Sequence, residues 1–187
     1  TDFGKTWTTV DGKPVETPLT TVKNPAMVHD YQSEGKNVYL MDMDFDKDGN
    51  PVCIYITSGG HEPGPENSPR YWKLTKWTGS EWTTSVIGES DHNYDMGSLY
   101  ILKDKWLVIG PLVNGPQIWG AGGEVVIMES ADEGKTWTWK KQVTFNSMLN
   151  NSYMRRPLHA HDPFYFFWAD GNPDHISISH LYFGDSE

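Results

Sequence analysis

Short segments of strand-like character recur along this chain, and polar or glycine- and proline-containing stretches separate them. The clearest are three apolar runs at 52–57, 106–110 and 164–168. Short runs rich in Val, Ile and aromatic residues are typical of buried β-strands. No long stretch rich in Ala, Leu, Glu and Lys indicates a helical bundle. The pattern therefore predicts an all-β protein built from many short strands.

Each apolar run stands second in a recurring set of strand-like segments. One segment precedes it, one follows it, and two of the three sets have a fourth. The sets repeat about every 55 residues, a spacing typical of four-stranded propeller blades. The predicted strands are 37–46, 52–57, 70–77 and 81–87, then 93–102, 106–110, 124–130 and 136–144, then 152–161, 164–168 and 175–183.

We therefore expect a β-propeller of four-stranded antiparallel blades, of which this chain holds about three. Its parts are the end of a preceding blade (1–22), two blades (37–90 and 91–146) and a partial blade (150–187). Propellers typically need at least about four blades to close. Further blades would then come from the rest of the protein or from another chain. A three-layer β-sandwich or a short β-solenoid is the alternative architecture.

One turn motif appears twice, and a degenerate copy appears once. Ser130–Trp137 reads S-x-D-x-G-x-T-W, Asp2–Trp7 reads D-x-G-x-T-W, and the weaker copy is Trp77–Trp82. In such a motif the Asp accepts hydrogen bonds from backbone N–H groups, and the Gly takes a position with positive φ. The motif predicts tight hairpin turns between strands.

These turns resemble the Asp-box of the sialidase-like (BNR) β-propellers. Longer segments resemble the BNR-4 type of secreted bacterial carbohydrate-active proteins, and the resemblance covers most of the chain. Related propellers include ulvan-type polysaccharide lyases, sialidases and non-catalytic sugar binders. The resemblance implies a propeller that acts on or binds carbohydrate and is secreted or periplasmic. The segments that carry it are 58–65, 90–100, 122–124, 153–157 and 167–171.

Composition and net charge exclude some classes of binding partner. The chain has 187 residues and a formal net charge of -10, which argues against binding to nucleic acid or to anionic membranes. No apolar run approaches the ~18 residues that a membrane span needs, so we expect no membrane insertion. Aromatic residues make up 13% of the chain, too many for a disordered protein. An acidic polysaccharide or glycan remains the expected partner from the resemblance.

Arginine is scarce, with three residues against twelve lysines, so each arginine is informative. Arg70, Arg155 and Arg156 all fall in or beside a predicted inner strand or its loop. A guanidinium binds carboxylate or sulfate with two parallel hydrogen bonds, which suits an acidic sugar. Only one of Arg155 and Arg156 can face the channel, because neighbouring strand residues point to opposite faces. A structural salt bridge is the alternative for each.

Histidine and tyrosine supply the candidate acid–base groups. His61 lies in a loop rich in Gly and Pro, and His92 and Tyr94 are two residues apart at the start of a predicted strand. Residues two apart on a strand share a face, and a His–Tyr pair can act as base and acid. Tyr153 shares a face with Arg155 by the same argument. Hydrogen bonding or packing in the channel wall is the alternative role.

Two further residues are candidate ligand contacts, and metal sites are not indicated. Trp119, in a Gly-rich stretch, is the best candidate for stacking on a sugar, and Glu124 with Tyr153 is the local candidate for the Tyr/Glu pair of a sialidase. A structural calcium or zinc ion is compatible with the acidic run 42–48 and with His159 and His161. The calcium loop lacks its final Glu, and the histidines lack a third ligand.

The first functional hypothesis is a lyase that cleaves a uronic-acid-containing polysaccharide by β-elimination. Such a reaction needs a cation or donor on the carboxylate, a base for the C5 proton and an acid for the leaving oxygen, and it requires no cofactor. An arginine with His61 or His92 and Tyr94 would supply these roles. The alternatives are a sialidase-like glycoside hydrolase and a non-catalytic propeller that binds a glycan or a protein.

Overall fold

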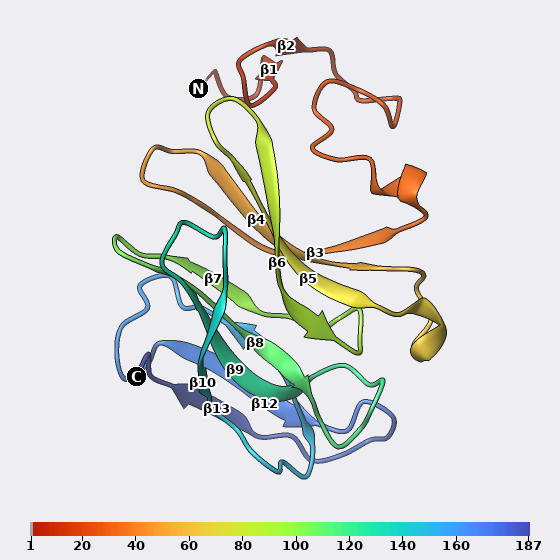
Figure 1. Cartoon of the computed structure of the whole chain (residues 1–187), viewed down its shortest axis with the longest axis vertical. Helices are drawn as coiled ribbons and strands as arrows, with labels where there is room; N and C mark the ends of the chain where they lie inside the picture. The colour runs from red at the N-terminus through yellow and green to blue at the C-terminus, as the bar shows by residue number, and fades with distance from the viewer. Residues whose placement is uncertain (1) are drawn as a thin grey trace.

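The computed structural model describes residues 2–187, and the fold is all-β. In these residues it has thirteen strands and two short 3₁₀ turns, η1 (Tyr31–Glu34) and η2 (Pro65–Asn67). Among residues 2–187, no helix has the length and the apolar character needed to cross a bilayer. Figure 1 shows an upper sheet, a lower sheet and a small N-terminal hairpin above them.

The upper sheet is an antiparallel meander of four strands in the order β3-β4-β5-β6. The central strands are the more deeply buried, and β4 carries the β-branched run that favours a pleated, packed surface. The turn between β3 and β4 is closed by Asp46, which accepts from the backbone N–H of Asp48 and of Asn50. The strands are β3 (Asn37–Phe45), β4 (Pro51–Ser58), β5 (Arg70–Trp77) and β6 (Trp82–Ser90).

The lower sheet has seven strands in the order β13-β12-β11-β9-β8-β7, with β10 also paired to β9. One antiparallel pair, Asn151 with Gly123, joins β11 to β9. The strands are β7 (Ser98–Ile101), β8 (Trp106–Asn114), β9 (Gly123–Ser130), β10 (Thr138–Gln142), β11 (Asn150–Arg155), β12 (Phe166–Gly171) and β13 (Leu181–Gly184). The N-terminal hairpin is β1 (Trp7–Thr8) with β2 (Pro14–Val15).

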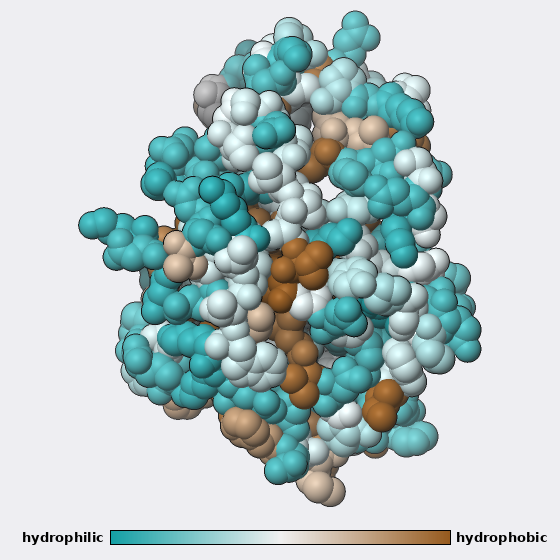
Figure 2. Space-filling view, viewed as in Figure 1, coloured by the Kyte–Doolittle hydropathy of each residue, from teal (hydrophilic) through white to brown (hydrophobic). Residues whose placement is uncertain are grey.

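Two apolar clusters hold the layers together. One lies between the upper sheet and the strands β7 to β9 and contains Trp72, which is fully buried. The other lies between those strands and β11 and β12 and contains Phe166, also fully buried. The face of the molecule in Figure 2 is largely hydrophilic, with a narrow run of apolar atoms along its middle. Most of the apolar burial is therefore between the sheets.

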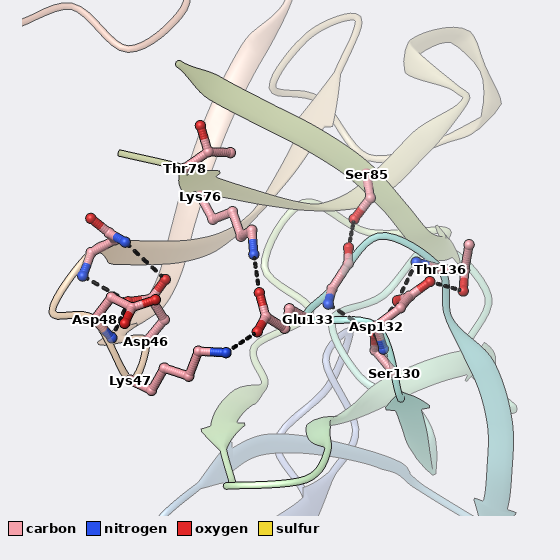
Figure 3. Close-up of polar contacts among 12 residues, drawn as sticks. Asp46, Lys47, Asp48, Lys76, Thr78, Ser85, Ser130, Asp132, Glu133 and Thr136 are labelled. Carbon is pink, nitrogen blue, oxygen red and sulfur yellow. Dashed lines mark hydrogen bonds and ion pairs between the residues drawn. The ribbon is translucent and has the colours of Figure 1, made fainter. Parts of the chain in front are cut away.

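The turn between β9 and β10 adds polar contacts between the two sheets (Figure 3). Within the turn, Asp132 accepts from the hydroxyl and the N–H of Thr136, and Gly134 has a φ of 80°. Glu133 reaches the upper sheet, where it accepts from Lys76 at 3.0 Å and Lys47 at 2.8 Å. The turn therefore clamps one sheet onto the other. The first copy of the motif has the same local form, with positive φ at Phe3 and Gly4.

The structure bears out the all-β prediction and modifies several strand boundaries. The predicted strand 70–77 is β5, whereas the strand predicted from 93 begins only at Ser98 and the strand predicted from 175 begins only at Leu181. The strands expected in the second and third blades are hydrogen-bonded into one sheet. The four-stranded set predicted within 37–90 does form a separate sheet.

Candidate functional site

Four of the predicted site residues belong to loops at one end of the sheets. In an antiparallel meander, alternate connections lie at the same end. The β4–β5 loop (59–69), the β6–β7 loop (91–97) and the β8–β9 loop (115–122) therefore share one end, and the β9–β10 turn of Figure 3 lies at the other. His61, His92, Tyr94 and Trp119 belong to these three loops.

Arg70 is at the centre of this end and is 1% exposed. Its Nε donates to Asn93 Oδ1 at 2.9 Å, and Nη2 donates to the carbonyl of Glu62 at 3.0 Å. Its Nη1 donates to the carbonyl of Gly64 at 3.0 Å and to Ser68 Oγ at 3.2 Å. The sequence predicts a substrate contact for Arg70, whereas the structure uses its guanidinium to hold the β4–β5 loop.

Asn93 completes this buried connection and is also 1% exposed. Its amide Nδ2 lies 3.2 Å from the carbonyl of Gly60 and 3.0 Å from that of His61, while its oxygen accepts from Arg70. The same amide nitrogen lies 3.3 Å from the hydroxyl of Tyr39. Asn93 therefore joins the His61 loop to the His92 loop and to the start of β3.

His92 and Tyr94 are neighbours, although not on a strand. Their ring centroids are 5.8 Å apart, and the backbone N–H of Tyr94 donates to His92 Nδ1 at 3.1 Å. Burial lowers the pKa of His92, and the charge of Arg70 lowers it further. A neutral imidazole that accepts at Nδ1 carries its proton on Nε2. His92 therefore presents an N–H donor, while the Tyr94 ring beside it is 53% exposed.

His61 is exposed and lies within hydrogen-bond distance of the carboxylate of its neighbour. Its Nε2 lies 2.9 Å from Glu62 Oε1. With the Nε2 proton shared with this carboxylate, the Nδ1 lone pair of a neutral His61 is free to accept a proton. A carboxylate in this position also stabilises the imidazolium that forms, as in the His–Asp part of a catalytic triad.

The β8–β9 loop is held against the same centre by two buried carboxylates. Trp119 is half-buried, has a φ of 67°, and donates its N–H to Asp91 at 2.9 Å. Its ring lies 5.7 Å from the Arg70 guanidinium carbon, in cation–π contact. Asp95 accepts from the N–H of Gly122 at 2.6 Å, and burial raises the pKa of Asp95 well above its usual value. The Arg70 guanidinium therefore covers one face of the Trp119 ring, the residue predicted from the sequence to stack on a sugar.

The strands β7 and β11 meet beside this end of the fold. Ser98 Oγ donates to the carbonyl of Met154 at 3.0 Å and accepts from the N–H of Arg156 at 3.0 Å. This places Tyr153 and Arg155 on a strand that touches the beginning of β7, four residues after Tyr94. Both side chains are exposed.

The three arginines thus have different surroundings. Arg156 pairs with Asp44 at 2.5 Å and lies over the ring of Tyr100, 5.5 Å from its centroid. Arg70 is buried in the loop contacts described above. Arg155 is exposed and has no carboxylate within salt-bridge distance among residues 2–187. Its guanidinium is therefore the one available to an anionic ligand.

Tyr153 has a backbone feature that the alternating pattern did not predict. It has a φ of 58°, and the pairing of β11 with β12 shifts register between Ser152 and Arg155. This bulge interrupts the two-residue period on which the shared face with Arg155 was predicted. Bulges and positive φ values at non-glycine residues are frequent near functional sites.

Glu124 lies within the fold rather than on the ligand side. It is 6% exposed and accepts from the hydroxyls of Thr144 and Ser147 and from the N–H of Ser147. These contacts tie the β10–β11 connection to β9. The carboxylate therefore has structural partners in place of the predicted ligand contact.

Through Asn93, the structure joins the loop that carries His61 to the loop that carries His92 and Tyr94. Tyr153 and Arg155 lie on β11, which contacts the first residue of β7. The sequence reasoning missed Tyr39, whose ring packs edge-on against Tyr94 at 5.4 Å, and it missed Asn93. An asparagine between His92 and Tyr94 was the available signal. No group of three or more His, Cys, Asp or Glu side chains in residues 2–187 is arranged to hold a metal ion.

No protein-family model matches this sequence, and no curated protein matches it. Two solved structures share its fold. One is described as a new family of polysaccharide lyase, PL25 ulvan lyase, with a TM-score of 0.67 and 13% identity. The other is described as the same lyase bound to -[GlcA(1-4)Rha3S]-, with a TM-score of 0.66 and 13% identity. Each alignment covers 97% of this chain and 40% of the lyase chain, so this chain spans less than half the length of those structures.

Proposed function

We propose that this chain carries the site of a lyase that cleaves an acidic, uronic-acid-containing polysaccharide by β-elimination. The observation that supports the proposal is that Asn93 joins the loop of His61 to the loop of His92 and Tyr94 at one end of the sheets. On β11, Arg155 adds an exposed guanidinium without a carboxylate partner among residues 2–187. The fold shared with the ulvan lyases supports the same reaction class, and one of those structures holds an acidic oligosaccharide.

The reaction has a simple balance of atoms. A base removes the proton from C5 of the uronate, the electron pair forms the C4–C5 double bond, and the C4–O4 bond breaks. An acid then supplies a proton to the leaving O4. The C5 proton becomes acidic only when donors neutralise the neighbouring carboxylate.

Two groups of this chain suit the carboxylate. Arg155 offers an exposed fork of N–H donors, which matches a carboxylate in a bidentate way. His92 offers a neutral Nε2–H, because its Nδ1 is occupied by the Tyr94 N–H. Both groups stabilise the charge that grows on the carboxylate when C5 loses its proton.

His61 and Tyr94 suit the proton transfers. His61 accepts the C5 proton at Nδ1, and Glu62 stabilises the resulting imidazolium. Tyr94 gives its hydroxyl proton to the leaving oxygen. Exchange with solvent returns both groups to their starting states, since both are exposed. No cofactor takes part in this scheme.

Among the alternatives, the arginine contacts favour a lyase over a sialidase-like hydrolase. A sialidase resemblance implies three arginines on one carboxylate, but here Arg70 and Arg156 are bound to other groups. Glu124, the candidate partner of a tyrosine nucleophile, is likewise engaged by Thr144 and Ser147. A non-catalytic glycan-binding protein remains the second candidate, because the site is open.

We further propose that the sheets are blades of a larger propeller, with further blades from the rest of the protein or another chain. The outer strand β13 supports this, because Leu181 is 76% exposed and Phe183 is 52% exposed, as expected of a face that another layer covers. A polymer substrate also implies that the protein acts as a secreted or periplasmic enzyme.

The test is turnover of glucuronate-containing polysaccharides such as ulvan, followed by the ultraviolet absorbance of the unsaturated product. We expect His61→Ala and Tyr94→Phe each to lower kcat by about 10²–10⁴-fold, the usual contribution of an acid–base group. The matched control is His159→Ala, which removes another exposed imidazole. Binding without turnover by the wild-type chain would favour the glycan-binding alternative. The absence of both binding and turnover would refute the proposal.

A further inference from the structure

A groove of about 670 Å³ lies beside the candidate site, along the segment that precedes β3. Ligand sites in proteins usually have volumes of about 300–1,000 Å³, so the groove can hold more than one sugar ring. We call it the N-terminal groove. Its lining includes Asn24, His29, Gln32, Lys36 and Tyr39.

Tyr39 is a common wall of the N-terminal groove and the candidate site. Its side chain lines the groove. Its ring also packs edge-on against Tyr94 at a centroid distance of 5.4 Å, and its hydroxyl lies 3.3 Å from Asn93 Nδ2. A chain of sugars that leaves the side of Tyr94 therefore meets the groove across a single aromatic residue.

The polar groups of the groove suit a sugar with an acidic substituent. Lys36 is half-buried and has no carboxylate within salt-bridge distance among residues 2–187. Two other polar side chains of the groove lining have partners: Asp30 pairs with Lys23 at 3.5 Å, and His29 lies 2.5 Å from the carboxylate of Glu34. An unpaired ammonium in a groove is available for a carboxylate or a sulfate.

Neutral parts of the groove suit the remainder of a sugar. The amide of Gln32 makes no hydrogen bond to another side chain or backbone group in residues 2–187, so it is free to bind hydroxyls. Leu19 and Val22 line the groove as well and are 52% and 65% exposed. Apolar side chains of this kind can pack on the C–H face of a sugar ring.

We infer that the N-terminal groove binds the sugars on one side of the cleaved bond, with Lys36 contacting a carboxylate or sulfate of a neighbouring unit. The inference rests on the proposed lyase function, because it extends the same substrate chain beyond the reacting uronate. Lys36 does not touch the reacting atoms in this arrangement. Its contribution is therefore to binding and should appear in KM rather than in kcat.

The experiment compares Lys36→Met with Lys23→Met, which removes a paired lysine from the same segment. The substrates are polymeric ulvan and the shortest ulvan oligosaccharide that the wild-type protein cleaves. We expect Lys36→Met to raise KM for the polymer about tenfold, with kcat unchanged and a smaller effect on the short substrate. We expect Lys23→Met to behave as the wild type does. Equal KM values for the wild type and Lys36→Met on the polymer would overturn the inference.

A binding measurement separates the failure of this inference from failure of the proposed function. Ulvan oligosaccharides are titrated into isotope-labelled protein, and the amide signals of Gln32 and Lys36 are followed by NMR. Shifts at these residues in the wild type, weakened in Lys36→Met, support the groove even if no product forms. Shifts confined to residues outside the groove, or an absence of binding, overturn the groove whatever the turnover experiment gives.

Discussion

Replacement of Arg70 by methionine should separate a buried structural arginine from a ligand-binding one. Methionine keeps an unbranched apolar stem and removes the guanidinium. The change leaves Asn93 Oδ1 without its donor, and Asn93 is only 1% exposed. An unsatisfied buried acceptor costs about 1–3 kcal/mol. The carbonyls of Glu62 and Gly64 also lose a bond each, worth about 0.5–1.5 kcal/mol net. We therefore expect a loss of about 2–6 kcal/mol of unfolding free energy.

The assay is equilibrium unfolding in urea, with Arg156→Met as the matched control. The Arg156 ion pair with Asp44 is partly exposed, so its removal should cost about 0–1 kcal/mol. Arg70→Lys should recover only part of the loss, because one ammonium cannot reach Asn93 and both loop carbonyls together. Equal unfolding midpoints for Arg70→Met and Arg156→Met would refute the assignment of Arg70 as the residue that holds the loops.

The same variant has a second readout at the site itself. The charge of Arg70 is one cause of the lowered pKa of His92, and burial is the larger one. Removal of the charge should therefore raise the pKa of His92, which an NMR titration of the imidazole measures. An unchanged His92 pKa in a folded Arg70→Met protein would show that the two groups are not electrostatically coupled.

Two further predictions concern the pH dependence of stability. Hydrogen bonds from Thr136 lower the pKa of Asp132 to about 2, and bonds from Lys47 and Lys76 lower that of Glu133 to about 2. The stability that these two carboxylates contribute is complete above their unfolded pKa values and is lost as the pH falls toward 2. The urea unfolding midpoint of Asp132→Asn should therefore decrease less on acidification than that of the wild type. The control, exposed Asp104→Asn, should follow the wild type. Burial raises the pKa of Asp95, so its stabilisation is complete below the unfolded pKa of 3.8 and is lost as the pH rises through the folded pKa. The difference in melting temperature, Asp95→Asn minus wild type, should therefore be more positive at pH ~8 than at pH ~4. The same difference at both pH values would contradict this prediction.

Local pattern predicted much of the secondary structure. The strand at 70–77 agrees with β5. The run at 52–57 is one residue shorter than β4 at each end, and the run at 124–130 is one residue shorter than β9 at its start. In these segments apolar and polar residues alternate, or the residues are continuously apolar, and turn-forming residues flank them. The information that specifies these strands is therefore local. The prediction failed at 93–97 because Asn93 and Asp95 use their side chains to fix loops. Such bonds compete with strand pairing and depend on distant partners.

The chemical character of the candidate site could also be predicted in part from the sequence. A His in a Gly/Pro-rich loop and a closely spaced His and Tyr are the residues that the structure joins through Asn93. Their relation was predicted for the wrong reason, since they share a loop and not a strand face. Tyr39 was not predicted, because nothing in its own strand indicates that its ring meets Tyr94.

The sequence by itself determined that this protein is all-β, where its central strands lie, and which residue types are available for chemistry at its loops. Only the tertiary structure decided which of those residues are free. Arg156 has its partner 112 residues away in Asp44, and Arg70 has its main partner 23 residues away in Asn93, while Arg155 has none within salt-bridge distance in the described part of the chain. A long cationic side chain is satisfied by whichever acceptors the packed sheets bring within reach. That proximity is a property of sheet packing, which hydrophobic periodicity along a single segment does not encode.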